Sequence, residues 1–165
     1  MLKEADCQVA ELTGGKRPNM VIASVGVGSW AHSVVEHYKA VDRDNLVVTV
    51  EPDTAACFKE SLHRGIITTV QTADTIMNGM NCGTPSKIAW PVLRDGTYAA
   101  VTVTDMESHE CVKYLQSQDV NAGPCGAATL AALKKLCAEH EIPSRSDMVV
   151  VLFSTEGTRQ YTVPA

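Results

Sequence analysis

The chain has 165 residues, of which 45% are hydrophobic and 20% are charged, a composition typical of one globular domain. Its formal net charge of −5 argues against a nucleic-acid partner, because phosphate backbones bind clustered lysine and arginine. The longest apolar run, Met148–Phe153, is far shorter than the roughly 18 residues that cross a bilayer. We therefore expect neither nucleic acid nor membrane as a partner.

The six cysteines and five histidines show neither Cys-x-x-Cys nor His-Glu-x-x-His spacing, so we predict no metal site. The cysteine pattern favours free thiols in a reducing compartment. The first residues contain no long apolar stretch of the kind found in secretion signals. Together these features predict a cytoplasmic location.

Two segments are expected along the chain. Residues 1–19 are interpreted as a leader or a remnant of upstream chain, and residues 20–165 as one α/β domain. Met20–Val25 reads as a strand, followed by glycines and by a helix that reaches Lys39. Leu46–Glu51 reads as a second strand, after which Asp53 is expected to cap a helix.

The second half of the chain continues this alternation. We expect a short helix near Thr75–Met80 and another over Ser86–Arg94. A strand is predicted at Ala99–Thr104, with Asp105 as the N-cap of the next helix. A further helix is expected to open at Gly123–Gly126 and to bury one face, and Met148–Phe153 is the last predicted strand. That face comprises Leu130, Leu133 and Cys137.

Strands that alternate with helices predict a three-layer α/β fold. We expect a mostly parallel sheet of about four strands with helices on both faces.

The glycine turn after the first strand is the strongest functional signal. Glycines at 26 and 28 permit close backbone approach at a helix N-terminus, where N–H groups lack partners. Several N–H groups of the turn Ser24–Ser29 are therefore predicted to hold a phosphate group, to which the Ser29 hydroxyl can add a hydrogen bond.

Two ligand classes compete for this turn. The segment Gly26–Ala31 fits a dinucleotide fingerprint, with Glu51 at about the expected distance for a ribose hydroxyl. Three polar loops, 81–86, 121–128 and 152–158, would have no role in that reading. They suggest a compact ligand at one edge of the sheet.

Five segments in order resemble diaminopropionate ammonia-lyases, which are fold-type II pyridoxal-phosphate enzymes related to the tryptophan synthase β chain. They are Val25–Ser29, Val50–Asp53, Thr75–Gly83, Gly123–Ala127 and Ser154–Gly157. The resemblance begins at about Asn19 and matches only the C-terminal part of such enzymes. It implies a partial large domain that binds pyridoxal phosphate non-covalently through Gly26–Ser29.

The resemblance also implies roles for later residues. Ser154 matches the hydroxyl that faces the pyridine nitrogen, and Thr155 is the alternative if the register is shifted by one. Five further residues are expected to line the cleft: Asn81, Cys82, Gly83, Gly123 and Gly126.

The Schiff-base lysine of the family lies far upstream of the phosphate turn, where this chain has only about two dozen residues. Lys3 and Lys16 do not lie in a strand-to-helix setting, and Lys87 is the one lysine near a polar loop. The resemblance therefore implies a truncated homologue of an ammonia-lyase that acts by α,β-elimination on a small amino acid such as diaminopropionate. Without the lysine, we expect no catalytic residue and no activity for the chain alone.

Two alternatives remain open at this stage. The chain could be a dinucleotide-binding domain, or a non-catalytic interaction module. In the second case, self-association or a partner that supplies the missing half would cover exposed apolar surface.

Overall fold

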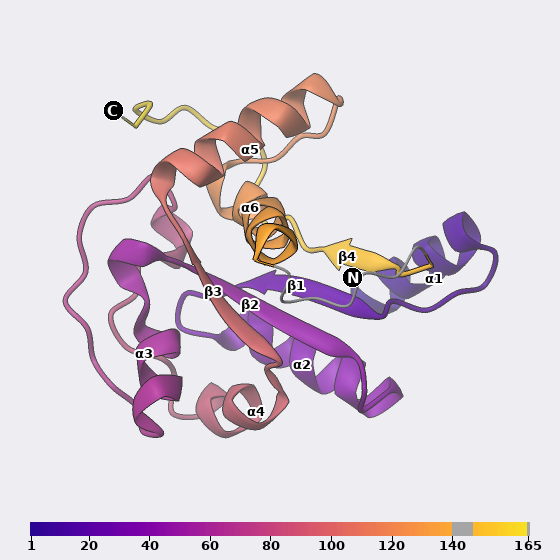
Figure 1. Cartoon of the computed structure of the whole chain (residues 1–165), viewed down its shortest axis with the longest axis horizontal. Helices are drawn as coiled ribbons and strands as arrows, with labels where there is room; N and C mark the ends of the chain where they lie inside the picture. Colours follow the sequence, from indigo (N-terminus) through magenta and orange to yellow (C-terminus); the bar gives the residue numbers. More distant parts are fainter. Residues whose placement is uncertain (140–146, 165) are drawn as a thin grey trace.

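The computed structural model describes residues 1–139 and 147–164. Their core is one sheet of four parallel strands in the order β3-β2-β1-β4 (Figure 1). The strands are β1 (Met20–Ser24), β2 (Leu46–Pro52), β3 (Ala99–Val103) and β4 (Val150–Leu152). The predicted parallel α/β sheet of about four strands is confirmed.

Helices cover both faces of the sheet, which confirms the three predicted layers (Figure 1). One face carries α5 (Asp105–Ser117) and α6 (Pro124–Ala138). The other face carries α2 (Ser29–Val41), α3 (Cys57–Arg64) and α4 (Ala89–Gly96), with α1 (Leu2–Thr13) packed beside them. Two single turns of 3₁₀ helix complete the described elements, η1 (Asp53–Ala55) and η2 (Asn78–Met80).

Strand β1 shows why both faces must be covered. Met20 and Ile22 belong to the core beneath α5 and α6, whereas Val21 and Ala23 belong to the core beneath α2 and α4. All four side chains are fully buried. A strand buried on both faces is a continuous apolar run, as the sequence of β1 is.

The buried face of α6 differs from the prediction. Leu130 and Leu133 are half-buried and Cys137 is exposed. The helix instead buries small side chains together with Leu136, because alanines let its backbone approach the sheet closely. These alanines are Ala127, Ala128, Ala131 and Ala132.

The predicted cap of α3 is wrong. Asp53 lies in η1, and the helix begins at Cys57. The buried Glu51 carboxylate accepts hydrogen bonds from the N–H groups of Phe58 at 2.7 Å and Lys59 at 2.8 Å. A side chain at the end of β2 therefore satisfies the N-terminus of α3.

The predicted cap of α5 is wrong by one residue. Thr104 is the N-cap and forms a capping box with Glu107: the Glu107 N–H donates to Thr104 Oγ1, and the Thr104 N–H donates to Glu107 Oε2. Asp105 instead accepts hydrogen bonds from Thr75 Oγ1 at 2.5 Å and from the Ile76 N–H at 3.0 Å. It ties a distant loop to the start of α5.

Other boundaries also shift. The short helix expected at Thr75–Met80 is reduced to η2. The helix expected at Ser86–Arg94 is α4, which starts at Ala89. Before this start, Ser86 Oγ accepts hydrogen bonds from the N–H groups of Ile88 and Ala89. The segment 1–19, expected to be a leader or remnant, contains helix α1. Residues 140–146 and 165 of the predicted domain lie outside the described residues.

No helix among the described residues combines the length and apolar character needed to cross a membrane. Within the same residues, no group of three or more His, Cys, Asp or Glu side chains could hold a metal ion.

Candidate functional site

The strand order creates a crevice at the carboxyl edge of the sheet. The chain runs from β1 outward to β2 and β3, and then returns to the other side of β1 to form β4. Ligands of open α/β sheets bind at such a reversal. A cavity of about 380 Å³ lies here, and it is lined by Ser24, Gly26, Val27, Gly28, Ser29, Trp30, Gly79, Met80, Cys125, Thr155 and Glu156.

The turn between β1 and α2 supplies one wall of this cavity. Within residues 1–139 and 147–164, no protein acceptor takes the four backbone N–H groups of Gly26–Ser29. Gly28 has φ +99, and a Cβ there would lie 2.8 Å from Leu93 Cδ1. A larger residue at this position would therefore combine backbone strain with a clash.

Neighbouring segments hold the turn in place. The Ser86 N–H donates to the Val27 carbonyl at 2.8 Å. A Cβ on Gly26 would lie 2.8 Å from the Gly79 carbonyl oxygen, so the turn packs directly against η2. The unpartnered donors therefore lie on a supported backbone, at the end of a helix of 13 residues.

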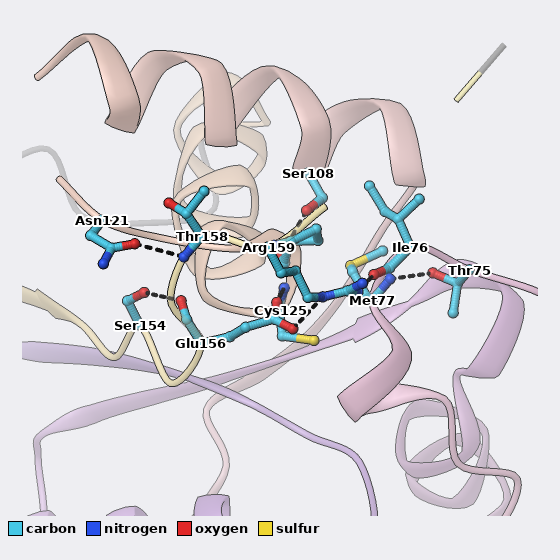
Figure 2. A network of polar contacts seen from close by, with 11 residues as sticks. Thr75, Ile76, Met77, Ser108, Asn121, Cys125, Ser154, Glu156, Thr158 and Arg159 are labelled. Atoms are coloured by element: carbon cyan, nitrogen blue, oxygen red, sulfur yellow. Dashed lines mark hydrogen bonds and ion pairs between the residues drawn. The ribbon is translucent and has the colours of Figure 1, made fainter. Parts of the chain in front are cut away.

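The N-terminus of α6 lies at the same cavity, but the N–H groups of Gly123 and Cys125 there are occupied. Glu156, on the loop after β4, accepts a hydrogen bond from the Cys125 N–H at 2.7 Å through Oε2 (Figure 2). Its backbone carbonyl accepts another from the Gly123 N–H at 2.8 Å. An internal carboxylate thus lies where the helix dipole favours negative charge.

Arg159 fixes this carboxylate from the other side. Its Nε donates to Glu156 Oε1 at 2.7 Å, and its guanidinium also donates to the Ile76 carbonyl (Figure 2). The Glu156–Arg159 pair therefore joins three segments of the cavity region: the loop before η2, the start of α6 and the loop after β4.

The two hydroxyls predicted to face a cofactor ring have different surroundings. Thr155 lines the cavity, and its Oγ1 is 3.3 Å from Ser24 Oγ. Ser154 is not among the lining residues of this cavity; its Oγ donates weakly to the Glu156 carbonyl at 3.4 Å and packs against Gly126. Of the two hydroxyls, that of Thr155 therefore belongs to a residue that lines this cavity, and that of Ser154 does not.

The five residues expected to line the cleft lie just behind its wall. Asn81, Cys82 and Gly83 follow η2, and of these Cys82 comes nearest to the turn, with Sγ 3.3 Å from where a Cβ of Gly26 would be. Gly123 and Gly126 leave room for the Ser154–Gly157 loop, since a Cβ on either would overlap it. These residues shape the site without lining the cavity.

Several lining residues were not predicted, among them Ser24, Trp30, Gly79, Met80 and Glu156. Cys125 is 4% exposed, and burial together with the Glu156 charge raises the pKa of its thiol to about 11. It is therefore protonated near neutral pH and unsuited to act as a nucleophile. The Ser-Thr-Glu-Gly string could have indicated Glu156, because a carboxylate after a strand can cap a neighbouring helix.

The eight lysines all belong to the described residues, and none of them lines the cavity. Lys3, Lys16 and Lys87 are exposed. No described amine is therefore positioned at the site.

Glu51 is not available to a dinucleotide ribose. Its side chain is 1% exposed, and its two carboxylate oxygens are taken by the N-terminus of α3. Glu51 therefore cannot serve as the acidic residue that the dinucleotide interpretation of the glycine turn requires.

Comparisons with known proteins agree with this geometry. The family model described as "Pyridoxal-phosphate dependent enzyme" matches residues 4–154, and so begins earlier than the resemblance seen from the motifs. A diaminopropionate ammonia-lyase of Salmonella typhimurium is 37% identical over 108 residues, which cover 62% of this chain and 26% of that protein. The Escherichia coli diaminopropionate ammonia-lyase is 31% identical over 93% of this chain.

A solved structure shows the same arrangement. The crystal structure of diaminopropionate ammonia-lyase from Escherichia coli in complex with D-serine matches with a TM-score of 0.81 and 27% identity, over 94% of this chain and 42% of that one. The chain spans 42% of the length of the curated Escherichia coli relative as well.

Proposed function

The chain belongs to the pyridoxal-phosphate dependent enzyme family, and from this we propose that its Gly26–Ser29 turn holds the phosphate group of pyridoxal phosphate. The observation that carries the proposal is the set of four backbone N–H donors without protein acceptors at the start of α2, on the wall of a cavity. Free donors and the positive end of a helix dipole favour an anion.

The start of α6, which is the second helix terminus at the cavity, supports the assignment of the phosphate to the start of α2. Glu156 already occupies the start of α6, and an added phosphate there would face a carboxylate. Only the start of α2, of these two helix termini, is open to an anionic ligand. The ring of the cofactor would then share the cavity with the hydroxyls of Ser24 and Thr155, which lie 3.3 Å apart on its wall.

When bound in an enzyme of this family, pyridoxal phosphate supplies an electron sink for chemistry at the substrate carbon. The residues of this chain would bind and orient it. The turn would hold the phosphate, and the Thr155 hydroxyl, with Ser154 as the alternative, would face the ring nitrogen. The Glu156–Arg159 pair would hold the surrounding loops in place.

The proposed role is that of a homologue of part of an ammonia-lyase that catalyses α,β-elimination on a small amino acid such as diaminopropionate. Support comes from the relatives and from the lining of the cavity, which among described residues contains no lysine. A family enzyme uses a lysine amine to bind the cofactor covalently. We therefore expect the chain alone to bind the cofactor reversibly, without turnover, in the cytoplasm.

Titration of the whole chain with pyridoxal phosphate, followed by visible absorbance, tests this proposal. We expect reversible binding, competition by inorganic phosphate, and weaker binding of pyridoxal, which lacks the phosphate group. Borohydride reduction should label no single lysine. A stoichiometric adduct at one lysine, or release of ammonia from diaminopropionate, would contradict the proposed lack of activity.

A matched pair of glycine variants locates the binding. Gly28→Ala should weaken pyridoxal phosphate binding about tenfold or more, because the new Cβ meets Leu93 and strains the turn. Gly65→Ala carries a similar strain at φ +71 but has no neighbour within 4 Å and lies outside the cavity. It should bind the cofactor normally. Equal binding by both variants would exclude the turn as the phosphate site.

We also propose that another chain, or a second copy of this one, pairs with the sheet. Within the described residues, β3 and β4 each have a hydrogen-bonded neighbour on one side only. Open edges of this kind favour pairing with added strands. Light scattering should show a dimer or larger species, whereas a monomer at all concentrations would count against self-association.

A further inference from the structure

Two hydroxyl groups lie together on the wall of the cavity at the Gly26–Ser29 turn. Ser24 is the last residue of β1, Thr155 lies on the loop after β4, and both residues line the cavity. Ser24 Oγ lies 3.3 Å from Thr155 Oγ1. Because β1 and β4 are parallel neighbours in the sheet, both hydroxyls are placed at the carboxyl ends of adjacent strands.

The two residues differ in exposure, which sets the direction of the hydrogen bond between them. Ser24 is 7% exposed, and Thr155 is the one hydrogen-bond partner of its side chain among the described residues. Thr155 is exposed. If Thr155 donated to Ser24, the buried Ser24 hydrogen would have no acceptor, and an unpaired buried donor is costly. Ser24 is therefore the donor and Thr155 the acceptor.

This direction leaves the hydrogen of Thr155 available to a ligand. A hydroxyl has one hydrogen, and its oxygen can accept a bond while the hydrogen is donated. A hydroxyl that accepts a hydrogen bond is also the stronger donor, because the two bonds polarise one another. The separation of 3.3 Å exceeds the roughly 2.5–3.0 Å of a strong O–H···O bond, so Thr155 can turn toward a ligand while it stays paired.

The neighbouring hydroxyl of Ser154 is arranged differently. Its Oγ donates to the Glu156 carbonyl at 3.4 Å, so its hydrogen is directed at the protein backbone (Figure 2). Ser154 also does not line the cavity. Of the two hydroxyls after β4, that of Thr155 is therefore the better donor toward a ligand in the cavity.

We propose that Ser24 is a positioning residue that directs the Thr155 hydroxyl at the ring nitrogen of bound pyridoxal phosphate. This inference rests on the proposed function, since it takes pyridoxal phosphate as the ligand of the cavity. An unprotonated pyridine nitrogen accepts a hydrogen bond and has no hydrogen of its own, so it requires a donor such as Thr155. Ser24 acts on the ring through Thr155 and not by direct contact.

Calorimetric titration of the whole chain with two ligands tests this role. The ligands are pyridoxal phosphate and its 1-deaza analogue, in which a C–H group replaces the ring nitrogen. The unmodified chain should bind the analogue about three- to tenfold more weakly, the range expected for one hydrogen bond. Ser24→Ala should reduce this difference to about twofold or less, and Thr155→Val should abolish it. Ser24→Thr and Thr155→Ser keep both hydroxyls and should retain it.

A matched control separates positioning from a general loss of stability. Ser61→Ala removes another buried serine hydroxyl, which donates to the Cys57 carbonyl outside the cavity, and should retain the full difference between the ligands. If Ser24 were merely structural, Ser24→Ala would weaken both ligands alike and leave the difference unchanged, which would overturn the proposal. Thr155→Val alters an exposed side chain, so it remains informative if Ser24→Ala fails to fold.

The same titrations distinguish failure of this inference from failure of the proposed function. Equal affinity of the unmodified chain for both ligands, with inorganic phosphate still competing, would overturn the role of Ser24 and leave the phosphate assignment intact. Loss of the difference in Ser154→Ala but not in Thr155→Val would assign the ring nitrogen to Ser154 and overturn it as well. Absence of binding by either ligand would contradict both the role of Ser24 and the proposed function.

Discussion

The Glu156 carboxylate accepts a 2.7 Å hydrogen bond from the backbone N–H of Cys125, which precedes it by 31 positions. The contact joins the loop after β4 to the first turn of α6. Because Glu156 is 22% exposed and also pairs with Arg159, the carboxylate is held on both sides.

Loss of the Glu156 charge should destabilise the protein. Glu156→Gln keeps the size of the side chain but removes the charge at the start of α6, so we expect a loss of roughly 1–3 kcal/mol in the free energy of unfolding. Urea denaturation measures it. Glu110→Gln, at an exposed pair with Lys113, is the control and should change stability little. Equal stability of the two variants would show that the charge of Glu156 contributes nothing.

Arg159 and Glu156 should act as one unit. In a double-mutant cycle of Glu156→Gln and Arg159→Met, we expect a coupling of roughly 0.5–3 kcal/mol, because either change alone removes the ion pair. The same denaturation measurement gives all four stabilities. Strict additivity of the two single changes would mean that Arg159 acts only through the Ile76 carbonyl.

Stability should depend on the protonation of Glu51. Burial, only partly opposed by the Phe58 and Lys59 N–H groups, raises the pKa of Glu51 from 4.5 to about 7. The folded state thus binds this proton more tightly than the unfolded chain. The stabilisation is full below the unfolded pKa of 4.5 and is lost as pH rises through about 7, a change of roughly 3 kcal/mol.

Urea denaturation at about pH 5 and about pH 8 measures this effect. Glu51→Gln should abolish the decrease in stability between the two values. Glu60→Gln, on the helix α3 that Glu51 caps and paired with Arg64, should retain it. A decrease of the same size in the Glu51 variant would assign it to other groups.

A methyl group at position 126 should disturb the loop after β4. Alanine is the better helix former by about 1 kcal/mol, yet Gly126→Ala should destabilise by roughly 1–3 kcal/mol, since its Cβ would overlap Ser154 Oγ. Adding Ser154→Gly should restore part of the lost stability, which thermal denaturation would measure. Stabilisation by Gly126→Ala alone would mean that the loop moves aside freely.

The sequence allowed the layers of the fold to be predicted because their signals are local. Apolar runs such as β1 and the glycines at 26 and 28 can be recognised within a few residues. The capping box of Thr104 and Glu107 is equally local, and attention to Glu107 would have placed the helix start correctly.

The errors arise where a distant contact decides the structure. Asp105 resembles a helix cap but binds the loop at Thr75 and Ile76, and Glu51 caps a helix from the preceding strand. The cavity wall also depends on a distant contact, since Cys125 and Glu156 come together only when β4 has joined the sheet. Local sequence patterns contain no information about such long-range contacts.

The site also has consequences for the order in which the protein folds. Ser24 and Thr155 face each other across 131 positions of the chain, whereas the segments that hold the Gly26–Ser29 turn, at Gly79 and Ser86, precede β4 in the chain. Contacts between distant positions form slowly because they close a large loop. During synthesis, the Gly26–Ser29 turn can therefore form before β4 arrives to complete the cavity. During this interval a nascent chain would present free N–H donors at the turn and an unpaired edge of β1.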